Sequence, residues 1–262
     1  MSDFVTTSRG DRVAYDHRGS GPALIFIAGA GPYRAIDPVT TATAEAAAEQ
    51  GISTIVYDRL GRGESPVDDR IDLQRELAVI EALIGVAGGS AVLCGHSSGC
   101  SIALAAAAAG LPVDGLVLWE APLGPQDGGA REWADEVDRR LTAGDLEGAQ
   151  LYYMKDMPAE FLDGVRNSPM WAGIVAQAPS LRADGESLAW AESAPLAELF
   201  AGIRVPVEVL MGEETYPVML VAADAIVDAI PGSTQKRMPG ANHSWEPTPM
   251  ATELAAFVTA AQ

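Results

Sequence analysis

A serine framed by two glycines is the residue whose spacing most directly indicates chemistry. The stretch Gly95-His96-Ser97-Ser98-Gly99 matches the pattern G-x-S-x-G, and it lies between the apolar run AVLC and the alanine-rich segment IALAAAAAG. In this pattern a sharp strand-to-helix turn strains the serine backbone, and glycines avoid the collisions that Cβ atoms would make beside it. The spacing therefore predicts that Ser97 is a nucleophile, and Ser98 is the weaker candidate because the glycines frame Ser97.

Two backbone N–H groups are expected to assist this serine. The turn places the N–H of Ser98 at a helix N-terminus, where it is free to bind a developing oxyanion. A second donor is expected from the loop Ala28-Gly29-Ala30-Gly31-Pro32, whose glycines let the backbone approach a ligand closely. We expect the N–H of Ala30 to be that donor, with Gly29 as the alternative.

The elements that must position these groups alternate between short apolar runs and helical stretches. An N-terminal hairpin is predicted to turn at Arg9-Gly10-Asp11, and further strands are predicted at 23–29, 52–58, 91–95, 115–120, 205–211 and 234–238. Helices are predicted at 38–50, at 69–86, directly after Ser97, at 217–230 and at 246–260. Continuous apolar runs separated by helices are typical of buried parallel strands. The sequence thus predicts an α/β fold with a mostly parallel central sheet flanked by helices.

Residues 121–201 interrupt this alternation. They contain no convincing β-type run and hold Trp133, Trp171 and Trp190, with several methionines and prolines. We interpret them as a helical cap inserted after the sixth strand, which divides the chain into a core at 1–120, the cap at 121–201 and the rest of the core at 202–262. The cap aromatics would either line an apolar substrate pocket or form a small core of their own, and the sequence leaves both open.

The stretch that follows the predicted strand at 52–58 adds a family resemblance. Residues 57–65 read Y-D-R-L-G-R-G-E-S, and with the strand order, the serine turn and the glycine loop they resemble the α/β-hydrolase superfamily. In that superfamily a D-x-R-G-x-G-x-S stretch follows the fourth strand. The resemblance covers essentially the whole chain outside the insertion and implies an α/β-hydrolase fold. One departure is Ala28-Gly29, where many members have His-Gly.

Among the three histidines, His243 is the candidate base. It follows the last predicted strand in the stretch MPGANHS, within a loop that leads to the final helix, and the resemblance implies a triad histidine in this loop. A neutral imidazole near the serine hydroxyl takes its proton on attack and returns it to the leaving group. We interpret His96 as packing or pocket wall, and His17 as a structural or surface residue.

The acid is the position where this chain departs from the family pattern. The resemblance implies an aspartate three residues beyond a glycine after the seventh strand, where this sequence has Thr215. Glu214, one place earlier, is one candidate. Glu120, which ends the predicted strand 115–120, is the other. We favour Glu120 because a carboxylate that ends a buried strand is costly unless a partner such as protonated His243 pairs with it.

A narrower resemblance points to the same choice. The fungal zearalenone lactonases, α/β hydrolases of similar length, have a G-x-S-S-G turn and a triad glutamate in an E-x-P context after the sixth strand. Ser97-Ser98, Glu120 with Pro122, and His243 are similar to those features, whereas those enzymes carry cysteine where this chain has His96. The resemblance implies the triad Ser97, Glu120 and His243 more than it implies a substrate.

Composition excludes several other roles. The formal net charge is −19, so the surface repels phosphate backbones and acidic membranes, and we expect neither nucleic acid nor membrane as a partner. No window approaches the ~18 uninterrupted apolar residues of a membrane span, and the N-terminus lacks a signal-peptide core, so we expect a cytoplasmic location. Cys94 and Cys100, the two cysteines, are expected to be buried and free. No Cys/His cluster has metal-ligand spacing, and we expect neither metal nor cofactor.

These observations lead to the hypothesis of a serine hydrolase. Ser97 would attack a small carboxylic ester or lactone, apolar or aromatic in character, and an acyl-enzyme would then be released by water. The same triad would also suit C–C bond hydrolysis or cofactor-free oxidation, and a non-catalytic protein could use the fold to bind a small ligand. The sequence does not separate these alternatives, and it leaves the oligomeric state open, a homodimer included.

Overall fold

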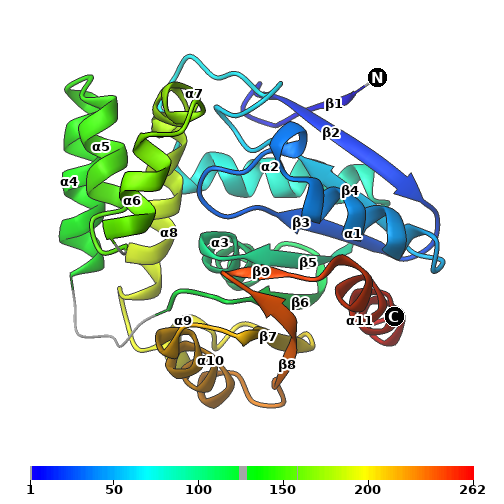
Figure 1. Ribbon diagram of the computed structural model, residues 1–262. Helices are drawn as coiled ribbons and strands as arrows, with labels where there is room; N and C mark the ends of the chain where they lie inside the picture. The colour runs from blue at the N-terminus through cyan, green and yellow to red at the C-terminus, as the bar shows by residue number, and fades with distance from the viewer. Residues whose placement is uncertain (1, 124–128, 158) are drawn as a thin grey trace.

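A single mixed sheet runs through the described residues, in the strand order β1-β2-β4-β3-β5-β6-β7-β8-β9 (Figure 1). The computed structural model describes residues 2–123, 129–157 and 159–262. The strands are β1 (Asp3–Thr6), β2 (Arg12–Gly19), β3 (Ala23–Ile27), β4 (Ser53–Tyr57), β5 (Ala91–His96), β6 (Val113–Trp119), β7 (Val207–Glu214), β8 (Thr234–Ala241) and β9 (Ser244–Trp245). Neighbours from β4 through β8 pair in parallel, whereas β1–β2, β2–β4 and β8–β9 are antiparallel. The predicted mostly parallel sheet is confirmed.

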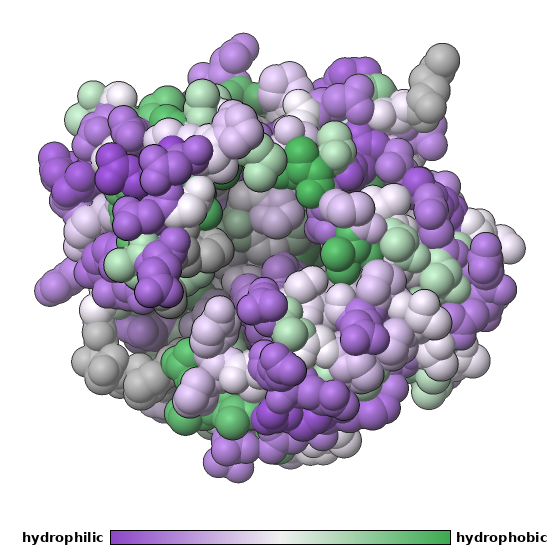
Figure 2. All heavy atoms as spheres, viewed as in Figure 1, coloured by the Kyte–Doolittle hydropathy of each residue, from purple (hydrophilic) through white to green (hydrophobic). Residues whose placement is uncertain are grey.

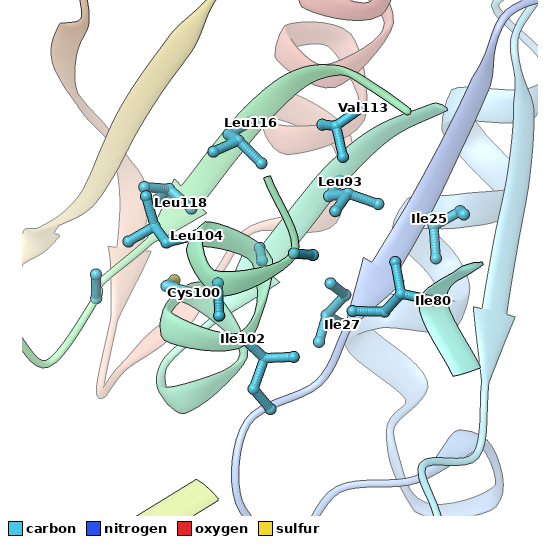
Figure 3. Packing of buried hydrophobic residues seen from close by; sticks show 14 of the residues in the cluster. Ile25, Ile27, Ile80, Leu93, Cys100, Ile102, Leu104, Val113, Leu116 and Leu118 are labelled. Atoms are coloured by element: carbon cyan, nitrogen blue, oxygen red, sulfur yellow. The ribbon is translucent and has the colours of Figure 1, made fainter. Parts of the chain in front are cut away.

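Helices cover both faces of this sheet because the central strands are apolar on both sides. In β3, Leu24 and Phe26 face the cluster formed with α1 (Pro38–Ala48) and α11 (Pro247–Ala260). Ile25 and Ile27 face the opposite cluster, formed with α2 (Leu73–Val86), α3 (Ser98–Ala108) and α10 (Pro217–Ala229). Figure 3 shows the second cluster, in which α3 packs against β3, β5 and β6. Burial of alternate residues on both faces fixes the register of each central strand.

Most element boundaries agree with the sequence predictions to within a few residues, and the differences have local causes. Helix α2 begins at Leu73 rather than at 69, because the Asp72 side chain accepts a hydrogen bond from the Arg75 N–H at 2.8 Å and caps the helix. Strand β8 extends to Ala241, and β9 pairs with it in a hairpin that the sequence did not predict. His243 therefore lies, as expected, between the last predicted strand and the final helix, and the connection there is a tight hairpin turn.

The chain between β6 and β7 contains helices and no strand among its described residues. This helical segment comprises α4 (Ala130–Thr142), α5 (Leu146–Tyr153), α6 (Ala159–Arg166), α7 (Trp171–Ala176), the 3₁₀ turn η2 (Ala178–Ser180), α8 (Leu181–Ala191) and α9 (Leu196–Leu199). A further 3₁₀ turn, η1 (Arg34–Ile36), precedes α1. Residues 124–128 and 158 of the predicted cap lie outside the described residues. The division into core and cap stays a prediction.

Several aromatic side chains of the helical segment pack inside it. The rings of Trp133 and Tyr153 are 4.8 Å apart, and both border a small cluster that includes Val137 and Leu181. Trp190 instead packs against the main core. These contacts favour the interpretation that the aromatics stabilise the segment itself. In the part of the chain that the structure describes, no helix combines the length and apolar character needed to cross a membrane.

Candidate active site

Ser97 lies at the junction of β5 and α3 in a strained backbone conformation, with φ 54° and ψ −128°. Both flanking glycines are sterically required. A Cβ atom on Gly95 would lie 2.6 Å from the Cα of Cys100, and one on Gly99 would lie 2.2 Å from the carbonyl oxygen of Ile27. The turn is therefore tight enough that only hydrogen fits at these positions, which agrees with the mechanics inferred from the G-x-S-x-G pattern.

This steric requirement makes a testable contrast between two helical glycines. Gly99→Ala should destabilise the protein by about 3 kcal/mol or more, because a backbone carbonyl must move to admit the methyl group. Gly85→Ala, at an exposed position of helix α2 with nothing near the added Cβ, should stabilise it by about 0.5–1 kcal/mol. Urea denaturation of both variants measures the two changes, and a neutral Gly99→Ala would contradict the tight packing of this turn.

The loop that is expected to supply an oxyanion donor approaches this serine closely. Gly29 approaches so closely that a Cβ atom on it would be 2.8 Å from the Cβ of Ser97. The backbone N–H groups of Ser98, Gly29 and Ala30 donate to no acceptor among the described residues. Because unpaired N–H groups next to a nucleophile are what an oxyanion requires, the arrangement suits the predicted role. It leaves both Ala30 and Gly29 available as the second donor.

His243 lies in a two-residue turn between β8 and β9. Ala241 pairs with Ser244, and the intervening Asn242 and His243 have φ values of 53° and 66°. Positive φ at both central residues is the signature of a type I′ turn, which joins antiparallel strands with the correct twist. The turn holds the imidazole so that its Nδ1 lies 2.5 Å from Oε2 of Glu120.

Glu120 receives a second hydrogen bond on its other oxygen. The N–H of Gly212 in β7 donates to Oε1 at 3.0 Å, and only 1% of the Glu120 residue is exposed. Burial alone would raise the pKa of Glu120, but the hydrogen bond from His243, the neighbouring hydroxyl of Thr215 and the hydrogen bond from Gly212 outweigh it and lower that pKa. The carboxylate is thus held in its ionised form. Glu214, the alternative acid, ends β7 and is exposed.

His96 packs against the turn that carries His243. Its Nε2–H donates to the carbonyl oxygen of His243 at 2.8 Å, and its ring lies 4.9 Å from the His243 ring and 5.3 Å from that of Trp245. Burial, reinforced by the nearby charge of His243, lowers the pKa of His96 to about 4. His96 therefore stays neutral near pH 7 and acts as packing that holds the turn, in keeping with its interpretation from the sequence.

The candidate catalytic residues also have strained backbone conformations. Among the described residues, the non-glycine residues with positive φ are Ser97, Glu120, Asn242 and His243. Such conformations cost free energy and persist where the surroundings impose them, often at functional sites. The structure brings His243 and Glu120 together directly. It forms no hydrogen bond between Ser97 Oγ and His243 among the described residues, and catalytic hydrogen bonds of this kind commonly tighten when substrate binds.

Comparison with known protein families adds the decisive observation. The model of the alpha/beta hydrolase family matches residues 24–257, which is most of the chain. The chain belongs to the alpha/beta hydrolase family. No curated protein matches it.

Solved structures show the same fold over the whole length of this alpha/beta hydrolase. An alpha/beta hydrolase from Sphaerobacter thermophilus is 29% identical, with a TM-score of 0.84 over 97% of this chain and 99% of that one. An esterase from a Rhodococcus species is 20% identical, with a TM-score of 0.63 over 100% and 99%. An enol-lactonase from Burkholderia xenovorans is 16% identical, with a TM-score of 0.65 over 99% of both chains. The last two likenesses show a shared fold.

The contacts of the two cysteines and of His17 agree with the structural roles expected for them. Cys94 and Cys100 are both buried and free, and burial raises the pKa of each thiol. His17 lies on β2, where its Nε2 is 2.6 Å from the hydroxyl of Ser53. The described residues contain no group of three or more His, Cys, Asp or Glu side chains arranged to hold a metal ion.

Sequence reasoning missed one cluster of buried charges next to the candidate site. Arg59, Arg62 and Asp184 are buried directly behind the candidate oxyanion loop, where both arginines donate to backbone carbonyls of residues 28–32. The two arginines stand in the quoted stretch at 57–65, but their types alone did not indicate where they point. Asp184 lies in an unremarkable polar helix of an acidic chain, so no signal in the sequence marked it.

Proposed function

We propose that this alpha/beta hydrolase cleaves carboxylic esters or lactones through an acyl-enzyme on Ser97. The observation that carries the proposal is the coincidence of backbone strain with chemistry. The strained non-glycine residues of the described chain include a serine at a nucleophile turn, a histidine and a buried glutamate, and the last two are in direct contact. Unpaired N–H groups at 98 and 30 complete a set suited to acyl transfer.

The hydrogen bond between His243 and Glu120 supports Nε2 as the imidazole nitrogen that acts as the base. An ionised carboxylate only accepts hydrogen bonds, so Nδ1 carries the proton that points at Glu120 and Nε2 keeps its lone pair. Nε2 would then remove the proton of Ser97 as the hydroxyl attacks the carbonyl carbon. Glu120 would stabilise the imidazolium that forms, without itself taking the proton.

In the subsequent steps the same groups act again, and His243 now donates the proton that it took from Ser97. The tetrahedral oxyanion would bind the N–H groups of Ser98 and Ala30, and protonated His243 would donate to the departing alcohol oxygen. Water, activated by His243, would then attack the acyl-enzyme and release the acid with Ser97 restored. For a lactone, the departing oxygen would stay attached to the acyl group, so a single hydroxy acid would be released.

The proposed substrate is small and apolar or aromatic. Figure 2 shows a hollow between the helical segment, at the left, and the rest of the molecule, with hydrophobic residues among those on its rim. Hydrophobic residues at the edge of such a hollow favour acyl groups that can leave water. Aromatic side chains that pack within the helical segment do not line a substrate pocket, so they give little support to an aromatic substrate. The length of the acyl chain is therefore the substrate property to test first.

A fluorophosphonate probe and an ester series test this function together. The native protein should be labelled once per chain, on the peptide that contains Ser97, and the heat-denatured protein should not be labelled. Across p-nitrophenyl acetate, butyrate and hexanoate, kcat/KM should rise by up to about fourfold per added CH₂, the factor that corresponds to ~0.8 kcal/mol of buried methylene. A matched series of γ- and δ-lactones measures the preference between ester and lactone. Absence of labelling would favour a non-catalytic binding protein, and a fall in kcat/KM with chain length would contradict the apolar substrate.

A further inference from the structure

Four charged side chains are fully buried where the segment after β4 meets helices α2 and α8, at 0% side-chain exposure: Arg59, Arg62, Glu76 and Asp184. Asp184 bridges the two arginines, accepting from Arg59 Nη1 at 2.6 Å and from Arg62 Nη2 at 2.8 Å. Arg59 also donates to Glu76 at 3.2 Å. Buried ion pairs are weak contributors to stability relative to apolar packing, so stability alone gives little reason to place two arginines here.

The arginines point at the loop that is expected to supply an oxyanion donor. Arg62 Nη1 donates to the carbonyl oxygen of Gly29 at 2.5 Å, and Arg59 Nη1 donates to that of Ala28 at 3.0 Å. In a trans peptide the C=O and the following N–H point to opposite sides. Holding the Gly29 carbonyl toward Arg62 therefore turns the N–H of Ala30 away from the buried charges. By the same reasoning, the Ala28 carbonyl held by Arg59 turns the N–H of Gly29 away from them, so the two arginines orient both candidates for the second donor.

The same aspartate also contacts the other half of the expected oxyanion site. The hydroxyl of Ser98 donates to Oδ1 of Asp184 at 2.7 Å, and Tyr153 of α5 lies close enough to Ser98 to interact with it. Ser98 is the first residue of α3, and its free N–H points out of the helix N-terminus. One carboxylate on α8 thus holds both the loop at 28–32, through the arginines, and the start of α3, directly.

We propose that Asp184, together with Arg59 and Arg62, positions the two backbone N–H groups of the oxyanion site, so that the helical segment is a structural part of the catalytic centre. The inference rests on the proposed function for its catalytic meaning. Independently of catalysis, we infer that the buried charges hold α8 and the loop 28–32 together as one unit. These three are positioning residues, since they act on the reacting atoms through the backbone of other residues.

Asp184→Asn tests the inference in the full-length protein. Active sites are first titrated with the fluorophosphonate, so that kcat refers only to folded, reactive molecules. We expect kcat to fall by about 10²-fold with KM within about threefold, as for a small misplacement of groups that act in the transition state. The Ki of a trifluoromethyl ketone, which forms an oxyanion on the serine, should rise by the same factor as kcat/KM falls. The milder Ser98→Ala, which removes the Ser98 hydroxyl but leaves Asp184 paired with both arginines, should lower kcat by about tenfold.

Glu186→Gln is the matched control. Glu186 lies on the same helix and also ties it to the core, through Arg70 Nη2 at 3.0 Å and the N–H of Leu73 at 2.8 Å, but it does not contact the loop 28–32. Its kcat per titrated site should stay within about twofold of the unmodified protein. Equal losses in Glu186→Gln and Asp184→Asn, or an unchanged kcat in the Asp184 variant, would overturn the inference and leave Asp184 as a fold-stabilising residue only.

Hydrogen exchange separates this inference from the proposed function. In Asp184→Asn, and in Arg62→Lys should the first variant fail to fold, amide exchange should accelerate both in α8 and in the peptide that covers 28–32. Faster exchange in α8 alone would refute the coupling, whether or not the protein hydrolyses esters. A native protein that fluorophosphonate does not label would instead refute the proposed function, and the exchange result would still decide whether the loop and the helix are held together.

Discussion

Ser97→Ala is expected to lower kcat on p-nitrophenyl butyrate by about 10⁵- to 10⁶-fold, the scale on which serine hydrolases lose activity when the nucleophile is removed. The substitution deletes the only atom that would bond to the acyl carbon and leaves the positive-φ turn and both flanking glycines in place. Residual turnover should come from the oxyanion site and from binding alone. Steady-state kinetics with an active-site titration measure the loss.

Ser98→Ala is the comparison that makes this result specific. The neighbouring hydroxyl is buried and engaged with Asp184, so its loss should cost only about tenfold, through misplacement of the adjacent N–H. A thermal melt checks that both variants remain folded. If Ser98→Ala were the more damaging change, or if Ser97→Ala kept a hundredth of the activity, Ser97 would not be the nucleophile.

Glu120→Gln should lower kcat by about 10³- to 10⁴-fold with little change in KM. The carboxylate accepts a hydrogen bond on each oxygen, from His243 Nδ1 on one and from the Gly212 N–H on the other. A glutamine side chain has a single acceptor oxygen. If that oxygen faces Gly212, the amide NH₂ faces Nδ1 and forces the tautomer that cannot act as base. If it faces Nδ1, two donors meet in a buried site.

The control for this variant is Glu214→Gln, which alters an exposed carboxylate at the end of β7 and should change kcat by less than about twofold. The order of the two effects is the test. A larger loss at position 214 than at position 120 would show that the triad acid comes from β7, as in the pattern that the family resemblance implies.

Much of the fold followed from patterns that are local in the sequence. Continuous apolar runs predicted β3 to β7 because a strand buried on both faces needs apolar residues at most positions, as in the 23–27 run. The Gly95-to-Gly99 turn was recognisable because its steric demands leave few residue choices. Strand β9 was missed because two residues carry no periodicity, and the type I′ turn before it uses Asn242 and His243 where glycine is the usual signal.

A site residue was predictable from the sequence only where it stood out from its own sequence neighbours. Glu120 did so, as a lone charge at the end of a buried strand, and the structure places it against His243. Asp184 did not, because its burial depends on two arginines more than a hundred residues earlier, a contact that only the packing of α8 creates. Long-range pairing of buried charges leaves no periodic trace in either segment.

That buried carboxylate also limits how this scaffold can be remodelled. The stretch between β6 and β7 looks like a module that could be exchanged for one from another protein, since it enters and leaves the sheet at neighbouring strands. A graft without an acidic side chain in the place of Asp184 would leave Arg62 buried without its carboxylate partner and Arg59 with Glu76 alone, a defect of several kcal/mol. Any chimera must therefore carry over that one negative charge, or replace both arginines together with the module.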